Sequence, residues 1–247
     1  MFLTKHDLKL SYGVDLEIGA CYVDRKVPEG NLYWKDRTIY VPGAPGYIFM
    51  PIFADLLFRV GVNKEALLAE TQLLTAERIL HSAALLEHKK ITWEQHVEQA
   101  LSNESHPAAQ ALFADLSQYL SQGPKPKSIV TGLGTKFPSL NRADTYLISL
   151  TSLDVDSFDL KLCLDAWYSL MTYFLIMDDL ADIKDDLKNN EENAFIDAGL
   201  DQNGMSCIME MINDSIHVMN KINPVMANRI DHKKSLIDLE VILKSIR

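Results

Sequence analysis

The spacing of apolar residues predicts a mostly helical chain from residue 47 onward. Tyr47 to Val60 is apolar on most sides, which is typical of a largely buried helix. Leucines recur at helical spacing between residues 64 and 90, and a continuous helical pattern runs from Ser157 to about Asn189. The same spacing predicts two closing helices, at residues 205–220 and 225–246. The predicted fold is therefore an all-α bundle of about eight helices.

Glycines and prolines interrupt the helical pattern in two places. Residues 1–46 are rich in both, so we expect an irregular N-terminal segment there. Within it, Leu32 to Val41 is aromatic and β-branched, which predicts a short hairpin. Gly123 to Pro138 predicts a loop, and a loop of this length inside a domain is often functional or mobile. Neither interruption marks a domain boundary, so residues 1–247 are predicted to form a single α-helical domain.

The composition excludes some function classes. The chain has 24 basic and 34 acidic residues, a net charge of −10, which argues against nucleic acid as a partner because phosphate binding needs basic surface. The three cysteines form no CxxC pair, and the N-terminus lacks the apolar core of a signal peptide, so a cytoplasmic location is predicted. The most apolar stretch, Cys163 to Met177, is too short to span a bilayer and contains Asp165. No integral membrane segment is predicted.

The carboxylates that follow this apolar stretch are the most informative chemical feature of the chain. From Asp178 to Glu192 there are seven carboxylates and two lysines. Asp178, Asp182 and Asp186 recur every four residues and so share one helix face, where like charges repel unless a cation is present. Carboxylate oxygens on a rigid face suit Mg²⁺, which also accepts phosphate oxygens. The alternative interpretation is a solvated acidic helix end, as most charge runs are.

The segment FLIMDDLADIKDD resembles the second aspartate-rich motif of the trans-isoprenyl diphosphate synthases. Asp178, Asp179 and Asp182 match the aspartates of that motif, and Asp186 matches the acidic residue that follows it. The resemblance implies a helical bundle of the isoprenoid-synthase type around an apolar cavity. It also implies a transferase of isoprenoid biosynthesis, in which Mg²⁺ ions on aspartates of two facing helices bind an allylic diphosphate.

The chain departs from that family where a first aspartate motif would stand on an earlier helix. The segment His81 to Lys90 is the nearest equivalent, but His88 and Lys89 occupy the positions of the aspartate pair. The downstream metal motif of the related terpene synthases has no full counterpart either, because His217 and Lys221 stand at its serine and glutamate positions. The resemblance covers roughly residues 140–222 and rests on about ten of them.

The resemblance assigns roles to particular residues. Asp178, Asp179 and Asp182 are the predicted catalytic residues. Asp178, Asp182 and Asp186 are the predicted metal ligands, and Asp179 supports the site or binds a further ion. Basic residues in and beside the predicted loop would hold the diphosphate as point charges: Lys125, Lys127, Lys136 and Arg142. Gly132 and Gly134 would let backbone amides approach the same anion. Aromatic side chains that can stabilise a cation would wall the isoprenoid pocket: Trp167, Tyr168, Tyr173 and Phe174. For the loop, the alternative is a mobile surface segment.

Three functional hypotheses follow. The first is Mg²⁺-dependent binding of an isoprenoid diphosphate, with ionisation or condensation by a divergent prenyltransferase or terpene-synthase-like enzyme. The second is a catalytically silent helical partner subunit or binding module, supported by the missing first aspartate pair. The third and weakest is a metal-binding bundle built on Glu77 and His81, which are four residues apart, although no second Glu-x-x-His copy is evident. A homodimer is compatible with each hypothesis, because helical bundles with apolar faces often pair.

Overall fold

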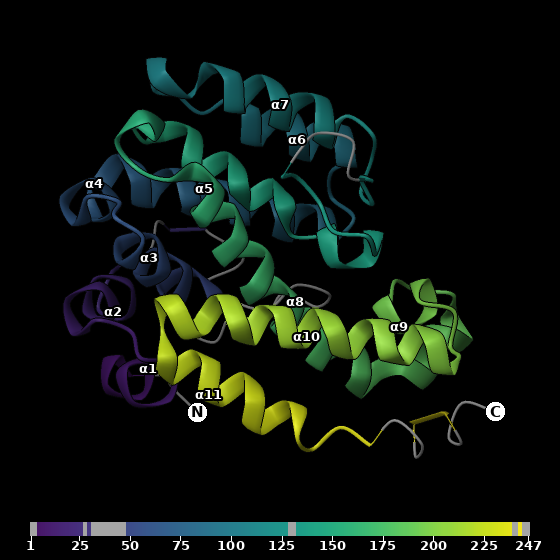
Figure 1. Cartoon of the computed structure of the whole chain (residues 1–247). Helices are drawn as coiled ribbons and strands as arrows, with labels where there is room; N and C mark the ends of the chain where they lie inside the picture. Colours follow the sequence, from purple (N-terminus) through teal and green to yellow (C-terminus); the bar gives the residue numbers. More distant parts are fainter. Residues whose placement is uncertain (1–3, 27–28, 31–47, 128–131, 239–241, 244–247) are drawn as a thin grey trace.

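The computed structural model describes residues 4–26, 29–30, 48–127, 132–238 and 242–243. Across these ranges the chain forms helices and no strand, which confirms the predicted all-α class. In chain order the elements are α1 (Lys5–Tyr12), α2 (Leu16–Val23), α3 (Phe49–Arg59), α4 (Lys64–Leu68), α5 (Glu70–Glu87), α6 (Trp93–Leu101), η2 (Pro107–Ala109), α7 (Gln110–Leu120), η3 (Pro138–Asn141), η4 (Asp144–Ser152), η5 (Val155–Ser157), α8 (Leu160–Asn189), α9 (Ala194–Asp197), α10 (Gln202–Ile222) and α11 (Pro224–Lys234), where η marks a 3-10 helix (Figure 1).

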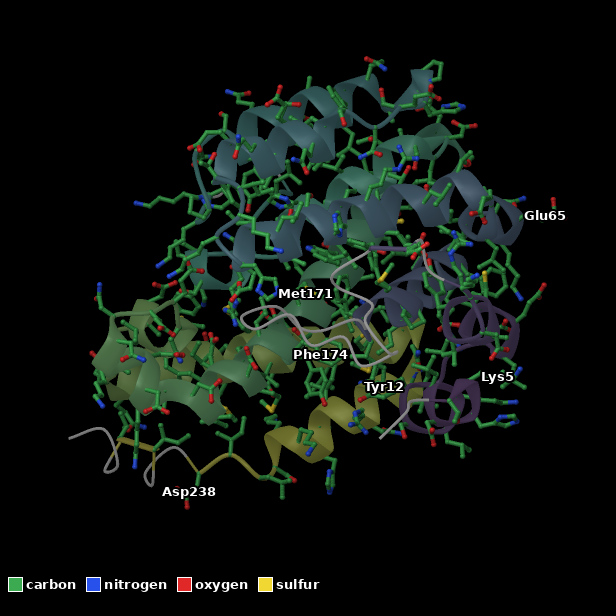
Figure 2. The ribbon with its side chains drawn as sticks, turned by 180° about the vertical axis from the view of Figure 1, so that it is seen from behind. Lys5, Tyr12, Glu65, Met171, Phe174 and Asp238 are labelled. Carbon is green, nitrogen blue, oxygen red and sulfur yellow. The ribbon has the colours of Figure 1, made fainter. Side chains whose placement is uncertain are left out.

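The long helix α8 runs through the centre of the fold (Figure 1). It packs against α3 and α10, and α10 packs in turn against α11. Trp167 of α8 is fully buried, with its ring 4.9 Å from that of Phe53 on α3, so large aromatic surfaces are removed from water at this crossing. Figure 2 shows Phe174 of α8 close to Tyr12 of α1, with ring centroids 6.5 Å apart. The predicted continuous helix is confirmed, and it begins at Leu160.

The prediction of an irregular segment over residues 1–46 is wrong for its first part. Thr4 and Asp7 form a capping box at the start of α1, and the Asp15 side chain accepts hydrogen bonds at the start of α2. Gly13 ends α1 with a φ of 72°, a left-handed conformation that favours glycine. The glycine that suggested irregular structure is therefore a helix cap. The hairpin predicted at 32–41 lies outside the described residues.

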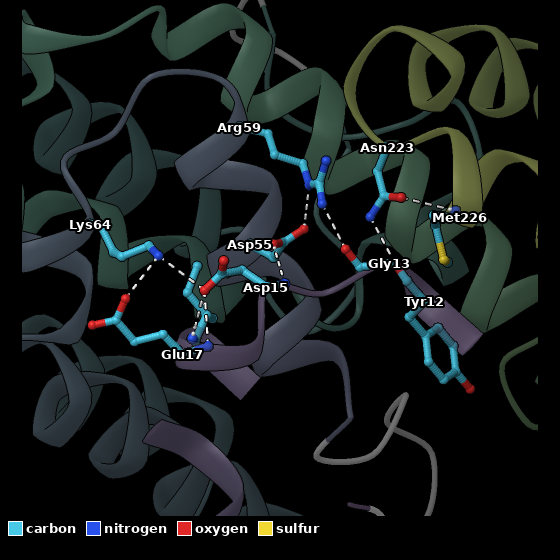
Figure 3. Close-up of polar contacts among 10 residues, drawn as sticks. Tyr12, Gly13, Asp15, Glu17, Asp55, Arg59, Lys64, Asn223 and Met226 are labelled. Atoms are coloured by element: carbon cyan, nitrogen blue, oxygen red, sulfur yellow. Dashed lines mark hydrogen bonds and ion pairs between the residues drawn. The ribbon is translucent and has the colours of Figure 1, made fainter. Parts of the chain in front are cut away.

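Polar contacts attach this helix pair to the rest of the bundle (Figure 3). Asp55 of α3 is completely buried, and its carboxylate accepts from the Asp15 backbone N–H at 2.8 Å and from Arg59 Nε at 2.6 Å. Arg59 Nη2 also donates to the Gly13 carbonyl at 2.6 Å. From the other end of the chain, Asn223 Nδ2 donates to the carbonyl of Tyr12 at 2.8 Å. Since buried polar groups are costly without partners, these bonds fix the turn between α1 and α2.

The 3-10 helix η4 is an element that the apolar spacing did not predict. It is buried along most of its length and packs against α5, α6 and α7. Its first residue, Asp144, is fully buried and accepts hydrogen bonds from Tyr119, Trp167 and Tyr168 at 2.6, 2.8 and 3.1 Å. Burial raises the pKa of Asp144 to about 7, although the three donors favour the charged form. This carboxyl group joins α7, α8 and η4 in the core.

The last helix is shorter than the sequence predicted. The closing helix was predicted to reach residue 246, whereas α11 ends at Lys234, and Leu236 beyond it is exposed.

Within the described ranges, α8 alone is long and apolar enough to cross a membrane by length and composition. The structure buries 61% of its apolar window among other helices, as expected for a core helix. The described residues thus contain no clear membrane-spanning segment.

Candidate functional site

The candidate site lies at the C-terminal end of α8, where the helix leaves the core. The apolar run before it is mostly buried, and burial decreases across the aspartates. Asp179 is 2% exposed, Asp178 and Asp186 are half-buried, and Asp182 is exposed. The spacing that predicted a shared face for Asp178, Asp182 and Asp186 is realised, because α8 is a regular helix through all three.

Arg142, directly after η3, is the basic residue closest to the aspartates. Its Nη2 atom lies 2.8 Å from Asp179 Oδ1 and 3.3 Å from Asp178 Oδ2. Burial raises the pKa of Asp178, the Arg142 guanidinium opposes that shift, and the charges of Asp182 and Asp186 add to it. The like-charge repulsion expected from the sequence is therefore present, and one arginine relieves only part of it.

Asp179 is committed to the fold. Its Oδ2 atom accepts from the backbone N–H of Ala194 at 2.6 Å, at the start of α9, while Oδ1 faces Arg142. Burial raises the pKa of Asp179 to about 6, and Arg142 is the largest opposing influence. The side chain thus joins α8, α9 and the end of η3, so its first role is structural support.

Asn193 is a residue of this site that sequence reasoning missed. It is 1% exposed, and its Nδ2 atom donates to the Asp179 carbonyl at 2.7 Å and to Asp186 Oδ2 at 2.9 Å. Its Oδ1 atom caps α9 by accepting from the Phe195 N–H at 2.9 Å. The available signal was local, because asparagine is a preferred residue at the start of a helix.

The predicted metal ligands do not form a preassembled three-carboxylate site. Among the residues that the structure describes, no three histidine, cysteine, aspartate or glutamate side chains lie close enough together to hold a metal ion. Asp178, Asp182 and Asp186 are spread along two helical turns, and Asp186 is partly used by Asn193. Mg²⁺ commonly takes only one or two carboxylates and completes its shell with water and phosphate, so the pair Asp178 and Asp182 is the relevant unit.

The predicted lysines separate into different surroundings. Lys125 Nζ lies 3.5 Å from Glu192 Oε1, which brings this part of the loop to the acidic end of α8. Lys136 Nζ instead donates to Cys207 Sγ of α10 at 2.7 Å. Lys127 is exposed, and its backbone N–H donates to the side chain of Gln122. Residues 128–131, in the middle of the loop, lie outside the described ranges.

The amide of Gly134 is bonded within the protein, unlike the anion-binding role that the sequence suggested. Gly132 and Gly134 both have positive φ, 94° and 79°. The Gly134 N–H donates to the Tyr168 hydroxyl at 2.6 Å, and the next amide, of Thr135, donates to Asn141 Oδ1 at 2.8 Å. These donors hold the loop against α8 and η3, so in this arrangement they are not directed at an anion.

The predicted aromatic wall is divided into two pairs, which lie about two turns apart along α8 and contact different partners. Trp167 is a core residue that donates to Asp144, and Tyr168 bonds to the loop. Tyr173 and Phe174 pack against each other, 5.1 Å between centroids, and Phe174 faces Tyr12 of α1 (Figure 2).

Glu77, on which the hypothesis of a metal-binding bundle depends, is already paired with an arginine. Glu77 is buried, and its Oε1 atom accepts from Arg25 Nε at 2.6 Å, while Arg25 also binds Glu70. This ion pair joins the end of α2 to α5 and accounts for a carboxylate in the interior. His81 is partly buried, and burial lowers its pKa.

The end of α5 lies close to the acidic end of α8. Burial raises the pKa of Glu87, the last residue of α5; His88 opposes the shift, and the charges of Glu191 and Glu192 add to it. The charges at the end of α5 are thus influenced by the two glutamates that follow α8. Acidic and basic groups therefore act on one another at this end of the molecule. Comparison with models of known families, with curated protein sequences and with solved structures found no match to this chain.

Proposed function

We propose that the acidic end of α8 binds an isoprenoid diphosphate together with Mg²⁺. The observation that carries this proposal is the 3.3 Å contact between Arg142 Nη2 and Asp178 Oδ2. It combines a carboxylate that can take a metal with a guanidinium that can take a phosphate. The exposed carboxylate of Asp182 is one turn further along the helix.

Each residue has a defined role in this proposal. Asp178 and Asp182 ligate Mg²⁺, Asp186 lies next on the same face, and diphosphate oxygens and waters complete the octahedron. Arg142 moves its contact from Asp178 to the diphosphate, since a planar guanidinium suits phosphate as well as carboxylate. Lys125 exchanges Glu192 for the same anion. Condensation or ionisation of the bound ligand would make the protein a divergent prenyltransferase or terpene-synthase-like enzyme.

The second candidate is a catalytically silent helical binding module or partner subunit. It is favoured by a specific observation: the guanidinium of Arg142 already lies where it neutralises both Asp178 and Asp179. His88 and Lys89 at the end of α5 add positive charge where a second metal site would need carboxylates. In this interpretation the contact with Arg142 is a permanent structural ion pair.

Thermal unfolding with Mg²⁺ and geranyl, farnesyl or geranylgeranyl diphosphate tests the proposal. A ligand that binds only the native state at 100 times its Kd adds about 2.7 kcal/mol of stability, which raises Tm by several degrees in a chain of this size. The double variant Asp178→Asn with Asp182→Asn should abolish that rise. The matched control, Asp185→Asn with Asp214→Asn, removes the same charge from exposed positions and should keep it.

The outcomes separate the candidates. A rise in Tm that needs both Mg²⁺ and diphosphate, accompanied by release of inorganic diphosphate, supports the enzyme. The same rise without turnover supports a binding module. If the wild type shows no rise with any of the three diphosphates, the binding proposal fails and the ion pair of Arg142 is structural.

A further inference from the structure

A second concave surface lies between α6 and α7, independent of the proposed function. Both helices pack against η4, side by side at one edge of the bundle (Figure 1). The groove between them has a volume of about 680 Å³, within the range of small-molecule sites. Trp93, Val97 and Leu101 line it from α6 at four-residue intervals, and Leu120 lines it from the end of α7. These positions form one apolar stripe along α6.

The groove is rigid on its aromatic side. The Trp93 indole N–H donates to the Leu120 carbonyl at 3.1 Å, which fixes the ring across the two helices. The ring also packs edge-on against His96, 5.6 Å between centroids. His96 is itself buried and held by Ser82 Oγ at 2.8 Å and Thr145 Oγ1 at 3.1 Å. A wall that is ordered before binding reduces the entropy lost when a ligand binds.

The two charged residues that line the groove are both acidic, and its other polar side chains, Ser102, Ser121 and Gln122, are neutral. Glu94 and Glu98 are exposed at its edge, four residues apart on α6, and neither forms an ion pair with a described residue. A hydrogen bond with Thr92 lowers the pKa of Glu94, so this group is charged at neutral pH. The C-terminal end of α7, which closes the groove, has no basic residue in its last turn to offset its carbonyls.

These features select one class of occupant. Anionic ligands and anionic membrane surfaces are repelled by the two glutamates, and a second copy of this chain would bring a further net charge of −10. An indole face beside carboxylates attracts an ammonium group, while the stripe of Val97 and Leu101 accepts an apolar body. We propose that the groove between α6 and α7 binds a small organic cation, an alkyl- or arylalkyl-ammonium compound.

Calorimetric titration of the full chain at neutral pH tests this with three probes of equal length: octylammonium, 1-octanol and octanoate. Octylammonium should bind saturably at one site, octanol about tenfold more weakly because it lacks the charge, and octanoate not at all. The double variant Glu94→Gln with Glu98→Gln should reduce octylammonium affinity to about that of octanol. The control Glu65→Gln with Glu104→Gln removes two exposed glutamates outside the groove and should leave the affinity unchanged.

A steric variant keeps the test valid if the charge variant folds poorly. Ser102 is exposed and lines the groove, so Ser102→Trp fills it without altering the glutamates and should abolish octylammonium binding. The proposal is overturned if octylammonium does not bind saturably, if octanoate binds as well as octylammonium, or if binding survives both the charge variant and the steric variant.

Discussion

Two aspartate–arginine ion pairs in this protein have the same chemistry but lie in different surroundings. Asp55 and Arg59 lie beneath the turn between α1 and α2, where the aspartate side chain is 0% exposed and also accepts a backbone N–H. Asp178 and Arg142 lie at the end of α8, where the aspartate side chain is 26% exposed and further carboxylates follow. The first contact is one basic group for one acid, while the second leaves excess negative charge facing solvent.

The difference teaches which carboxylates are available for a ligand. A fully buried carboxylate whose bonds are satisfied stabilises a particular packing, and removing its partner leaves an uncompensated charge. A partly exposed carboxylate with further acidic groups beside it costs less to rearrange, because water and ions screen its charge. On this basis Asp55 and Asp179 are structural, whereas Asp178 and Asp182 can exchange partners. Measurements of stability can test this division without any ligand.

The largest expected effect is at Arg59. Arg59→Met should destabilise the protein by about 3 kcal/mol, because Asp55 loses its charged partner in the interior. The contact with the Gly13 carbonyl is lost as well. Urea unfolding followed by circular dichroism measures the change. Adding Asp55→Asn should restore part of the stability. If Arg59→Met changes the free energy of unfolding as little as a surface substitution does, the structural role of the Asp55–Arg59 pair is contradicted.

The second effect compares neighbours on α8. Asp179→Ala should cost about 2 kcal/mol, because it removes the acceptor of the Ala194 N–H and one partner of Arg142. Asp182→Ala should change stability by less than about 0.5 kcal/mol and raise it if anything, because it relieves repulsion on an exposed face. The same unfolding measurement serves for both. Equal losses at the two positions would mean that burial does not separate structural from available carboxylates here.

A separate effect, which appears as a pH dependence, concerns Asp144, a buried carboxyl group that accepts hydrogen bonds from three neutral side chains. Its pKa is raised to about 7 by burial, against an unfolded value near 4, so the folded state holds more protons than the unfolded state in between. Its contribution to stability is therefore fully present below pH 4 and is lost as pH rises to 7, by on the order of 1 kcal/mol per pH unit. Asp144→Asn should flatten the pH dependence of Tm between pH 4 and 7. An unchanged profile would contradict the assignment.

Much of the fold follows from residues that act locally. The apolar spacing over residues 157–189 predicted α8 because each residue of a helix interior makes the same local hydrogen bond. The capping box of Thr92 and Gln95 at the start of α6 is equally local, because its two partners are three residues apart. The N-terminal helices were missed because Gly13 suits both an irregular chain and a helix end. Nothing local distinguished η4, whose burial depends on α5, α6 and α7.

The site was predictable only in its composition. The sequence indicated which residues carry charge, and the spacing of Asp178, Asp182 and Asp186 placed them on one face. It did not indicate that Arg142 would contact Asp178, or that Lys136 would turn toward Cys207 while Lys125 reached Glu192. A cytoplasmic location and a homodimer stay predictions, as does the hairpin at residues 32–41.

The sequence by itself determined an all-α chain with an acidic helix end, because helix periodicity and like-charge spacing are properties of neighbouring residues. Only the tertiary structure decided that Asp179 supports the fold while Asp182 faces solvent, although the two are three residues apart. The physical reason is that burial is set by partners distant in sequence, here η3 and α9. Desolvation and pairing by those partners determine whether a carboxylate is held in the fold or left available to a ligand.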